Sequence, residues 1–240
     1  MKQTPTGSRW CQDMTNKSHK TVRFFFDYIS PYSYLAWTQL PNLIKKFGVN
    51  IQLCPVLFAG LLKVHNQLGP AEIPAKRRWM IDNVLRKAAS LAVSISPPTY
   101  HPFNPLLALR ATVATKTTEE LRLITEACFN AVWVESLHIV EPDVLISVLN
   151  LADLNGQKLV EQADTDVTKR ILQQNTDEAT SAGVFGVPTF VVDDQLFWGV
   201  GDVPFLEAWL SGDDLLEHEK SQLWRNGVKP SAQRRTTQDR

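Results

Sequence analysis

The stretch that decides the fold runs from Val22 to Ser33 and has the sequence VRFFFDYISPYS. Its first seven residues are rich in aromatic and β-branched side chains, which predicts a buried strand. Ser30-Pro31 predicts the start of a helix, because serine is a preferred N-cap and proline is favoured at the first helical position. Helical spacing continues to Phe47, and residues 49–53 alternate as a second strand. A strand, a helix and a strand within about 35 residues form a βαβ unit, so the sheet is expected to begin with parallel strands.

The rest of the chain has helical spacing until a hairpin near its end. Apolar residues recur with the helical period from about Gly60 to Gly156, where we expect the last of these helices to end. Thr117 and Glu120 form a capping box that opens one of these helices. Another helix is expected from about 166 to 182, followed by a hairpin over 189–198 and a short helix near 204–210. One apolar stripe comprises Ile81, Val84, Leu85, Ala88 and Leu91.

This order of elements predicts an α/β fold split by a helical insertion. We expect two parts of the chain, on either side of the insertion, to form one domain with a common sheet. The expected ranges are a polar N-terminal tail over 1–20, the α/β domain over 21–58 plus 166–212, the all-helical insertion domain over 59–165, and a charged C-terminal tail over 213–240.

The composition excludes several classes of function. The chain has 240 residues, with 25 Lys plus Arg against 25 Asp plus Glu, so its formal net charge is zero. That balance provides no general attraction to nucleic acid or to an anionic membrane. No apolar stretch approaches the roughly 18 residues of a membrane span, and residues 1–20 lack a signal-peptide core. We therefore expect a cytoplasmic protein with no nucleic-acid or membrane partner.

The cysteines and histidines suggest neither a disulfide framework nor a metal site. Cys11, Cys54 and Cys128 are far apart and no two form a C-x-x-C pair. The five histidines show no metal-ligand spacing. Trp79 and Trp133 lie on helical stripes and are expected in the core, although either side chain would also suit the wall of a pocket.

Ser30 is the first candidate for chemistry, because it lies where a strand passes into a helix. A polar side chain there faces unpaired N–H groups and the positive end of the helix dipole, a place that stabilises an anion such as a thiolate. The alternative is that Ser30 only caps the helix. The two roles are compatible, since a hydroxyl accepts from the backbone and donates to a ligand.

The second candidate is Phe185-Gly186-Val187-Pro188-Thr189, between the last long helix and the hairpin. A cis Val187–Pro188 bond would turn the backbone groups of Val187 outward toward an extended ligand. The alternative is a trans proline that only begins the strand, since about 5–6% of X–Pro bonds are cis.

Together the two motifs resemble the thioredoxin superfamily, and the helical insertion resembles that of its disulfide-oxidoreductase (DsbA-like) branch. That branch carries C-x-x-C at the helix cap, whereas this chain has Ser30-Pro31-Tyr32-Ser33, so dithiol exchange is excluded there. The chain is more similar to the 2-hydroxychromene-2-carboxylate isomerases and the kappa-class glutathione transferases. The shared pieces run in family order: FDYISPYSYLA from Phe26, Pro55 with Ala59-Gly60-Leu61, Gly69-Pro70 before Lys76, Pro102-Phe103-Asn104, Phe129-Asn130-Ala131-Val132-Trp133, and Phe185 to Thr189.

The resemblance implies a thioredoxin-like fold with glutathione as a bound thiol cofactor. By position, Ser30 would donate a hydrogen bond to the glutathione sulfur, and Val187, before a cis Pro188, would pair through its backbone with the cysteinyl part. Lys76 matches a cation near cofactor or substrate, and Asn104 falls in the substrate-side segment. Two alternatives remain open: Lys76 on a solvated helix face, and Asn104 as a turn former.

One loop departs from the family pattern. The relatives have Gly-x-Asp-Arg after the last strand, and the acid meets the γ-glutamyl end of glutathione. Without a gap, Gly201 occupies the acid's position and Asp202 the arginine's. Either two flexible glycines let Asp202 reach the ammonium group, or Asp202 caps the helix that opens near Pro204.

The family implies a glutathione-dependent isomerase acting on a small aromatic carboxylate of the hydroxychromene type, in aromatic catabolism. A hydroxyl donor and a helix dipole would together lower the thiol pKa by about one to three units. The first alternative is a kappa-like transferase that conjugates glutathione to electrophiles, and the second is a non-catalytic thioredoxin-like binding module. The family also implies a homodimer.

Overall fold

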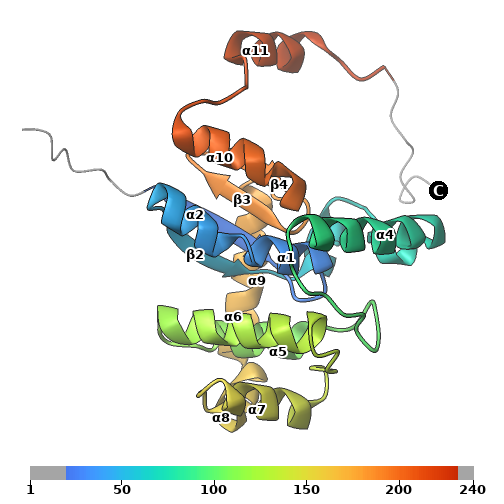
Figure 1. The fold of residues 1–240 in the computed structure, drawn as a ribbon, viewed down its shortest axis with the longest axis vertical. Helices are drawn as coiled ribbons and strands as arrows, with labels where there is room; N and C mark the ends of the chain where they lie inside the picture. Colours follow the sequence, from blue (N-terminus) through green and yellow to red (C-terminus); the bar gives the residue numbers. More distant parts are fainter. Residues whose placement is uncertain (1–19, 232–240) are drawn as a thin grey trace, which may run out of the picture.

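The computed structural model describes residues 20–231, and its centre is a four-stranded mixed sheet (Figure 1). The strand order is β2-β1-β3-β4, with β1 parallel to β2 and antiparallel to β3, and with β3 and β4 forming the expected hairpin. Phe24 lies opposite Leu53 on one side and Phe190 on the other. The strands are β1 (Thr21–Phe26), β2 (Asn50–Pro55), β3 (Thr189–Val192) and β4 (Gln195–Trp198).

The connection between β1 and β2 contains two helices, where the sequence predicted one. Ser30 is the N-cap and Pro31 the first residue of α1 (Pro31–Trp37), as expected, but α2 (Leu40–Phe47) begins only after a break. Pro41 explains the break, since it has no N–H for the carbonyl of Trp37 and its ring would clash with that carbonyl. Gly48 ends α2 in the left-handed conformation.

All the regular elements between β2 and β3 are helices. Figure 1 shows α5 to α8 stacked on one side of the sheet, with α9 running back to it. The Thr117–Glu120 capping box is confirmed at the start of α6. The elements are α3 (Phe58–Val64), η1 (Pro70–Glu72), α4 (Pro74–Ser90), α5 (Leu106–Val113), α6 (Thr118–Trp133), α7 (Pro142–Leu151), α8 (Gly156–Ala163) and α9 (Asp166–Ser181).

Gly156 begins a helix rather than ending one. Helix α7 stops at Leu151, and Gly156 is the first residue of α8, which Asn155 caps through its side chain. A Cβ on Gly156 would lie 2.5 Å from the carbonyl oxygen of Ile146, so the close approach of α7 and α8 requires a glycine.

Helix α4 buries a narrower face than its sequence predicts. Met80, Val84 and Ala88 are buried at i, i+4 and i+8, whereas Ile81 and Leu85 of the expected stripe are 49% and 53% exposed. They lie about 100° further round the helix, where no other element covers them. Trp79, which we expected in the core, is 61% exposed.

The C-terminal part contains more structure than a charged tail. After β4 come η2 (Val200–Asp202) and α10 (Val203–Ser211), and a further helix, α11 (His218–Gly227), follows within the predicted tail. Residues 1–19 and 232–240, and with them Cys11 and most of the predicted N-terminal tail, lie outside the described residues. Within 20–231 no helix is long and apolar enough to cross a membrane.

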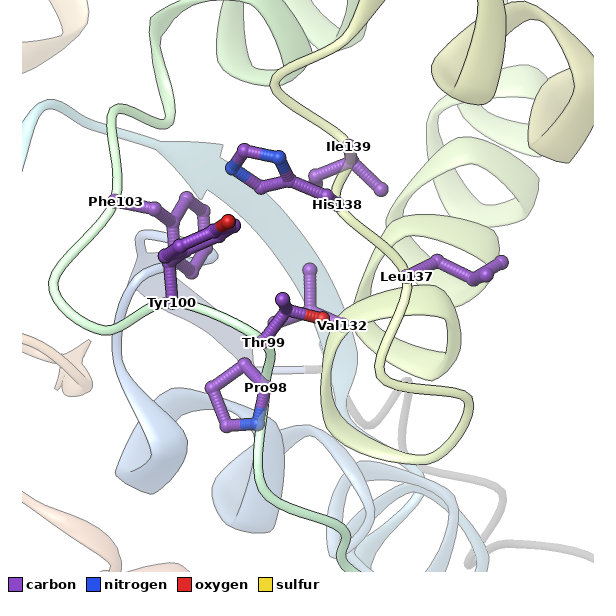
Figure 2. Close-up of a pocket in the computed structure, with 8 residues that line it drawn as sticks. All are labelled: Pro98, Thr99, Tyr100, Phe103, Val132, Leu137, His138 and Ile139. Atoms are coloured by element: carbon purple, nitrogen blue, oxygen red, sulfur yellow. The ribbon is translucent and has the colours of Figure 1, made fainter.

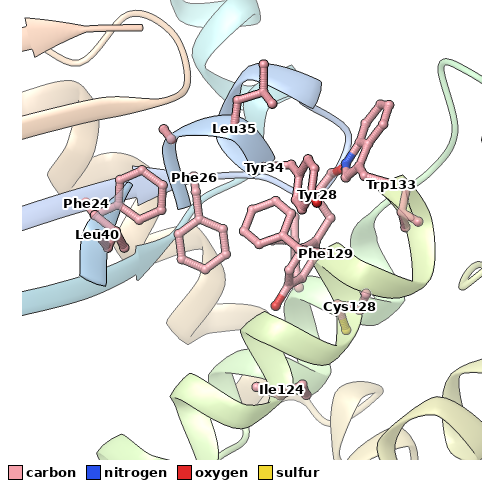
Figure 3. Packing of buried hydrophobic residues seen from close by; sticks show 14 of the residues in the cluster. Phe24, Phe26, Tyr28, Tyr34, Leu35, Leu40, Ile124, Cys128, Phe129 and Trp133 are labelled. Carbon is pink, nitrogen blue, oxygen red and sulfur yellow. The ribbon is translucent and has the colours of Figure 1, made fainter. Parts of the chain in front are cut away.

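One hydrophobic core joins the sheet to the helical segment (Figure 3). The ring of Phe129 on α6 lies 5.5 Å from that of Phe26 and 5.0 Å from that of Tyr28, measured between centroids. Trp133, one turn further along α6, is buried, as expected. Aromatic pairs at these distances add to the stability from burial, so the β1–α1 connection rests directly on α6.

Candidate functional site

The connection from β1 to α1 holds Ser30 in a fixed position. The Ser30 side chain caps α1 by accepting a hydrogen bond from the backbone N–H of Ser33 at 3.1 Å. The Ser30 N–H donates to the carbonyl of Asp27 at 3.2 Å, and only 7% of Ser30 is exposed. The capping role is therefore confirmed. It leaves the hydroxyl proton free to donate elsewhere.

Two side chains from the helical segment hold the carbonyls just before Ser30. The indole N–H of Trp133 donates to the carbonyl of Tyr28 at 2.9 Å, and His101 Nε2 donates to the carbonyl of Ile29 at 2.9 Å. Burial lowers the pKa of His101, and the positive charge of Arg77 acts in the same direction, so the ring is neutral near pH 7. The sequence does not mark His101 as a site residue, because the histidines lack a metal-ligand spacing. Its position directly before Pro102-Phe103-Asn104, a segment shared with the family, is the signal that could have identified it.

Asp27 is a buried acid beneath the same connection. Its carboxylate accepts from the N–H of Ile29 at 3.1 Å and from the N–H of Phe58, the first residue of α3, at 2.9 Å. Burial raises the pKa of Asp27 from 3.8 to about 7, although these backbone hydrogen bonds act in the opposite direction. Asp27 thus joins the end of β1, the approach to Ser30 and the start of α3.

Val187 and Ser30 are brought together from positions 157 residues apart. The Val187–Pro188 bond is cis, as the family resemblance implied. The Ser30 hydroxyl donates to the Val187 carbonyl across 3.4 Å, a long and therefore weak hydrogen bond. Among the described residues, no hydrogen-bond acceptor is found for the N–H of Val187.

The loop after β4 borders this site and is held by Asp202. Gly199, with φ +82°, donates its N–H to the carbonyl of Pro188 at 2.8 Å. Asp202 is the N-cap residue of α10, but its side chain does not cap that helix. Instead Oδ2 accepts from the N–H of Trp198 at 2.9 Å. The alternative that Asp202 caps α10 with its side chain is therefore wrong, because the carboxylate binds the backbone of β4 instead. Binding of glutathione by Asp202 stays a prediction.

Lys87 of α4 is a cation at this loop that sequence reasoning missed. A Cβ on Gly201 would lie 3.5 Å from Lys87 Nζ, an ordinary contact distance, so the ammonium group lies directly beside this loop. Lys87 is half-buried, and within residues 20–231 no carboxylate pairs with it. No local pattern marked this lysine, because the contact depends on how α4 meets η2.

The protein's own described thiols are unsuited to act as nucleophiles. Cys54 and Cys128 are both free. Burial raises the pKa of each thiol to about 12, so both are protonated near pH 7.

The family model for the DSBA-like thioredoxin domain matches residues 21–211. This chain belongs to that family. The DSBA-like domain therefore spans the sheet, the helical segment and α10, and it stops before α11.

Curated relatives of this DSBA-like protein carry two activity names. A 2-hydroxychromene-2-carboxylate isomerase of Sphingobium xenophagum is 27% identical over 193 residues, which cover 80% of this chain and 98% of the relative. Glutathione S-transferase kappa 1 of Homo sapiens is 25% identical over 228 residues, covering 90% and 97%. Both are enzymes, and each is matched over nearly its whole length.

Solved structures agree on the thioredoxin-like DsbA fold. A 2-hydroxychromene-2-carboxylate isomerase superposes with a TM-score of 0.74 at 21% identity, covering 85% of this chain and 98% of the other. The cytosolic disulfide reductase DsbM from Pseudomonas aeruginosa, solved with GSH, has a TM-score of 0.57 at 15% identity, covering 85% and 98%. At these identities the likeness establishes the fold alone.

The other two predicted site residues of this DSBA-like domain differ in surroundings. Lys76 is exposed in the first turn of α4 and makes no ion pair within the described residues. Asn104 is exposed, and its Oδ1 accepts from the N–H of Leu106 at 3.1 Å, a turn contact before α5. Turn formation by Asn104 is therefore confirmed, and its amide nitrogen remains available to a substrate.

Two hollows of the DSBA-like domain have walls that do not include Ser30. Figure 2 shows a shallow one beside the segment that carries His101, where Tyr100, Phe103 and His138 gather. A cavity of about 230 Å³ lies between the starts of α6 and α8 and includes Thr117 and Asn155 in its wall. Among residues 20–231 no cluster of His, Cys, Asp or Glu is suited to hold a metal ion.

Proposed function

We propose that this protein is a glutathione-dependent isomerase of the 2-hydroxychromene-2-carboxylate type, in which Ser30 stabilises the glutathione thiolate. The observation that carries the proposal is the 3.4 Å contact between the Ser30 hydroxyl and the Val187 carbonyl. This contact supports a single site built from two motifs that are far apart in the sequence. The relative named as an isomerase supports this activity, and the relative named as a kappa glutathione transferase supports glutathione as the thiol.

The unpaired groups at this contact fit an extended thiol peptide. The N–H of Val187, before the cis Pro188, would donate to the backbone of the cysteinyl part of the ligand. The long bond from Ser30 to Val187 leaves the hydroxyl able to turn toward a sulfur atom at little cost.

Bound glutathione would supply a thiolate nucleophile that is regenerated in each turnover, and Ser30 and the backbone of Val187 would hold it. Ser30 favours that thiolate by donating to it. A hydrogen bond to a charged group contributes about 1.5–3 kcal/mol, which lowers a thiol pKa by about one to two units. The dipole of α1 adds less than a long helix would, since α1 has only seven residues.

The cations of α4 support an anionic, aromatic carboxylate as substrate. Lys87 lies at the loop that borders Ser30, and Arg77 lies near enough to His101 to lower the pKa of its ring. A carboxylate on cofactor or substrate would neutralise one of them. Lys76, Asn104 and Asp202 complete the proposed binding residues. The free cysteines are consistent with our inference of a cytoplasmic location.

The decisive experiment follows the thiol as well as the product. Affinity is first measured by titrating the protein with glutathione. Turnover is then assayed with hydroxychromene carboxylate and with a chlorodinitrobenzene-type electrophile, while free thiol is counted. An isomerase converts the hydroxychromene and leaves the glutathione concentration unchanged. Loss of one thiol per product instead indicates the kappa-like transferase, and no binding or turnover indicates the non-catalytic module.

The cysteine variants separate bound glutathione from a protein thiol. Cys54→Ser and Cys128→Ser, alone or together, should keep the activity, because both thiols are protonated. Loss of activity with an unchanged circular dichroism spectrum would assign the chemistry to a protein thiol and contradict the proposal.

A further inference from the structure

The peptide unit between Ile29 and Ser30 is hydrogen-bonded at both ends. Its carbonyl accepts from His101 Nε2 at 2.9 Å, and its N–H donates to the carbonyl of Asp27 at 3.2 Å. Because a peptide unit is planar, it rotates as one body, and that rotation changes the φ angle of Ser30. This unit therefore sets the direction in which the Ser30 side chain leaves the backbone, and it cannot rotate without breaking a hydrogen bond.

His101 is the side chain that holds this unit. The other bond of the unit, from the N–H of Ser30 to Asp27, joins backbone to backbone and is the longer of the two. The preceding unit is held separately, by Trp133 at its carbonyl and by the Asp27 carboxylate at its N–H. Loss of the His101 contact would therefore free the carbonyl end of the unit that contains the N–H of Ser30.

The ring of His101 is suited to donate one constant hydrogen bond. A carbonyl only accepts, so Nε2 carries the proton, and in the neutral ring Nδ1 carries none. Burial, and then the positive charge of Arg77, lower the pKa of His101, so the ring stays neutral near pH 7. The ring also packs edge-to-face on Trp133, with 5.7 Å between the centroids. Packing and protonation together keep one N–H directed at Ile29.

We propose that His101 is a positioning residue for the reaction, because its hydrogen bond to Ile29 holds the Ser30 hydroxyl where it meets the thiol. That hydroxyl contacts two groups at once: it accepts from the N–H of Ser33 at 3.1 Å and donates to the carbonyl of Val187 across 3.4 Å. Rotation of the peptide unit would lengthen at least one of these contacts. The role in thiolate stabilisation rests on the proposed function, whereas the role in holding the Ser30 cap does not.

The connection from α4 to α5 carries both His101 and a proposed substrate residue. Asn104 follows His101 by three residues, directly before the turn into α5. The same connection would therefore hold the serine through the Ile29 carbonyl and the substrate through the Asn104 amide.

Two variants separate the hydrogen bond of His101 from its ring packing. His101→Phe keeps a ring against Trp133 but has no N–H, whereas His101→Gln lacks the ring and supplies an amide N–H in place of Nε2. His138→Phe is the matched control, since His138 lies 4.8 Å from Tyr100, the residue before His101 (Figure 2). Within the described part of the chain, no hydrogen bond joins the His138 side chain to residues 27–30.

The first measurement uses the ligand-free protein. Amide hydrogen exchange, followed by NMR, reports on the N–H groups of Ser30 and Ser33, which bind the Asp27 carbonyl and the Ser30 hydroxyl. Both should exchange at least about tenfold faster in His101→Phe, because the hydrogen bond that fixes the peptide unit is lost. His101→Gln should restore most of the protection, and His138→Phe should match the wild type. Unchanged protection in His101→Phe, or no recovery in His101→Gln, would overturn the proposal.

The second measurement follows the thiol. The ultraviolet absorbance of the thiolate, titrated against pH, gives the pKa of bound glutathione. That pKa should rise by about one unit in His101→Phe, and kcat should fall about tenfold with a smaller change in the dissociation constant for glutathione. Faster amide exchange with an unchanged thiol pKa and kcat would overturn the role of His101 in the reaction. If the wild type binds no glutathione, the proposed function fails together with the thiol part of this role, and amide exchange still decides whether His101 holds Ser30.

Discussion

At the scale of single residues, Ser30 performs two tasks with one side chain. Its oxygen accepts from Ser33 N–H and so caps α1, while its proton is shared only weakly with the Val187 carbonyl. The cap fixes the direction of the Cα–Cβ bond, and the weak second bond leaves the proton available. A residue that caps a helix is therefore not excluded from chemistry.

Ser30→Ala should lower turnover about 100-fold, the usual effect of losing one preorganised donor. It should also destabilise the fold by about 1 kcal/mol through loss of the cap. Ser33→Ala is the matched control, since the buried Ser33 hydroxyl has no hydrogen-bond partner among the described residues. Initial rates and urea denaturation of both variants check the prediction. An unchanged rate in Ser30→Ala would contradict the serine mechanism.

Asp202→Asn should raise the dissociation constant for glutathione at least about tenfold while leaving the melting temperature nearly unchanged. Asparagine keeps an oxygen that accepts the Trp198 N–H, so the loop should hold, but the charge that would meet an ammonium group is lost. Calorimetric titration and thermal melts measure the two quantities. If the melting temperature drops and glutathione affinity holds, the carboxylate only supports the loop.

Lys76→Ala should raise KM for glutathione or for the substrate with a smaller effect on kcat, as expected for lost uniform binding. Lys87→Ala is the informative comparison, because Lys87 lies at the loop bordering Ser30 whereas Lys76 is exposed. Steady-state kinetics with each ligand varied in turn assign the role. Unaltered KM and kcat values for Lys76→Ala would contradict a binding role and show that Lys76 lies only on a solvated helix face.

At the scale of elements, one carboxyl group ties three of them together. Asp27 directly follows β1. Its carboxylate accepts hydrogen bonds from the N–H of Ile29, just before Ser30, and from the N–H of the first residue of α3. Such a buried acid couples the geometry around Ser30 to pH. Because its pKa is raised on folding, its contribution to stability is greatest below pH 4 and is lost as the pH rises toward 7.

Asp27→Asn should therefore destabilise the protein more at pH 5 than at pH 8. The contribution lost over the whole range is on the order of 4 kcal/mol for a shift of about three pKa units. His101 acts in the opposite sense: its pKa is lowered, so its contribution to stability grows as pH rises toward 6.5. The contribution of His101 is present in the wild type and in Asp27→Asn, so it cancels when the unfolding free energies of the two proteins are compared. Equal destabilisation at both pH values would contradict the raised pKa of Asp27.

At the scale of the whole molecule, the helical segment and the sheet share one core. Phe129 of α6 lies among Phe26, Tyr28, Tyr34 and Trp37, all from the first part of the chain. Trp133 adds a hydrogen bond to the same connection. The inserted helices thus help to build the surroundings of Ser30, and we propose that the two parts unfold together.

Phe129→Ala should cost about 3–5 kcal/mol, the usual range for removing a fully buried phenylalanine. Near-ultraviolet and far-ultraviolet circular dichroism should lose signal at the same denaturant concentration in both the wild type and the variant, because neither part keeps its core alone. Leu151→Ala, at an exposed position, is the control and should change stability by less than about 0.5 kcal/mol. Two separate transitions would show that the helical segment folds independently.

Features that depend on near neighbours along the chain could be predicted from the sequence alone. The aromatic strand, the Ser30-Pro31 helix start, the Thr117–Glu120 capping box and the hairpin are all present, since each is set by side chains within a few residues. The motif order determined the thioredoxin-like fold and the cis Pro188. The break before Pro41 was also within reach of local rules, because a proline inside a helix removes a hydrogen bond.

The packing of the whole chain sets which helix faces are covered and which distant groups meet. Trp79 has an apolar side chain at helical spacing, yet it is exposed because no element packs on that side of α4. The hydrogen bond of His101 to Ile29, the approach of Lys87 to Gly201 and the contact between Ser30 and Val187 each join separate elements. Such contacts depend on how helices pack on the sheet, which is a sum of many weak interactions over the whole chain. No local pattern contains that sum.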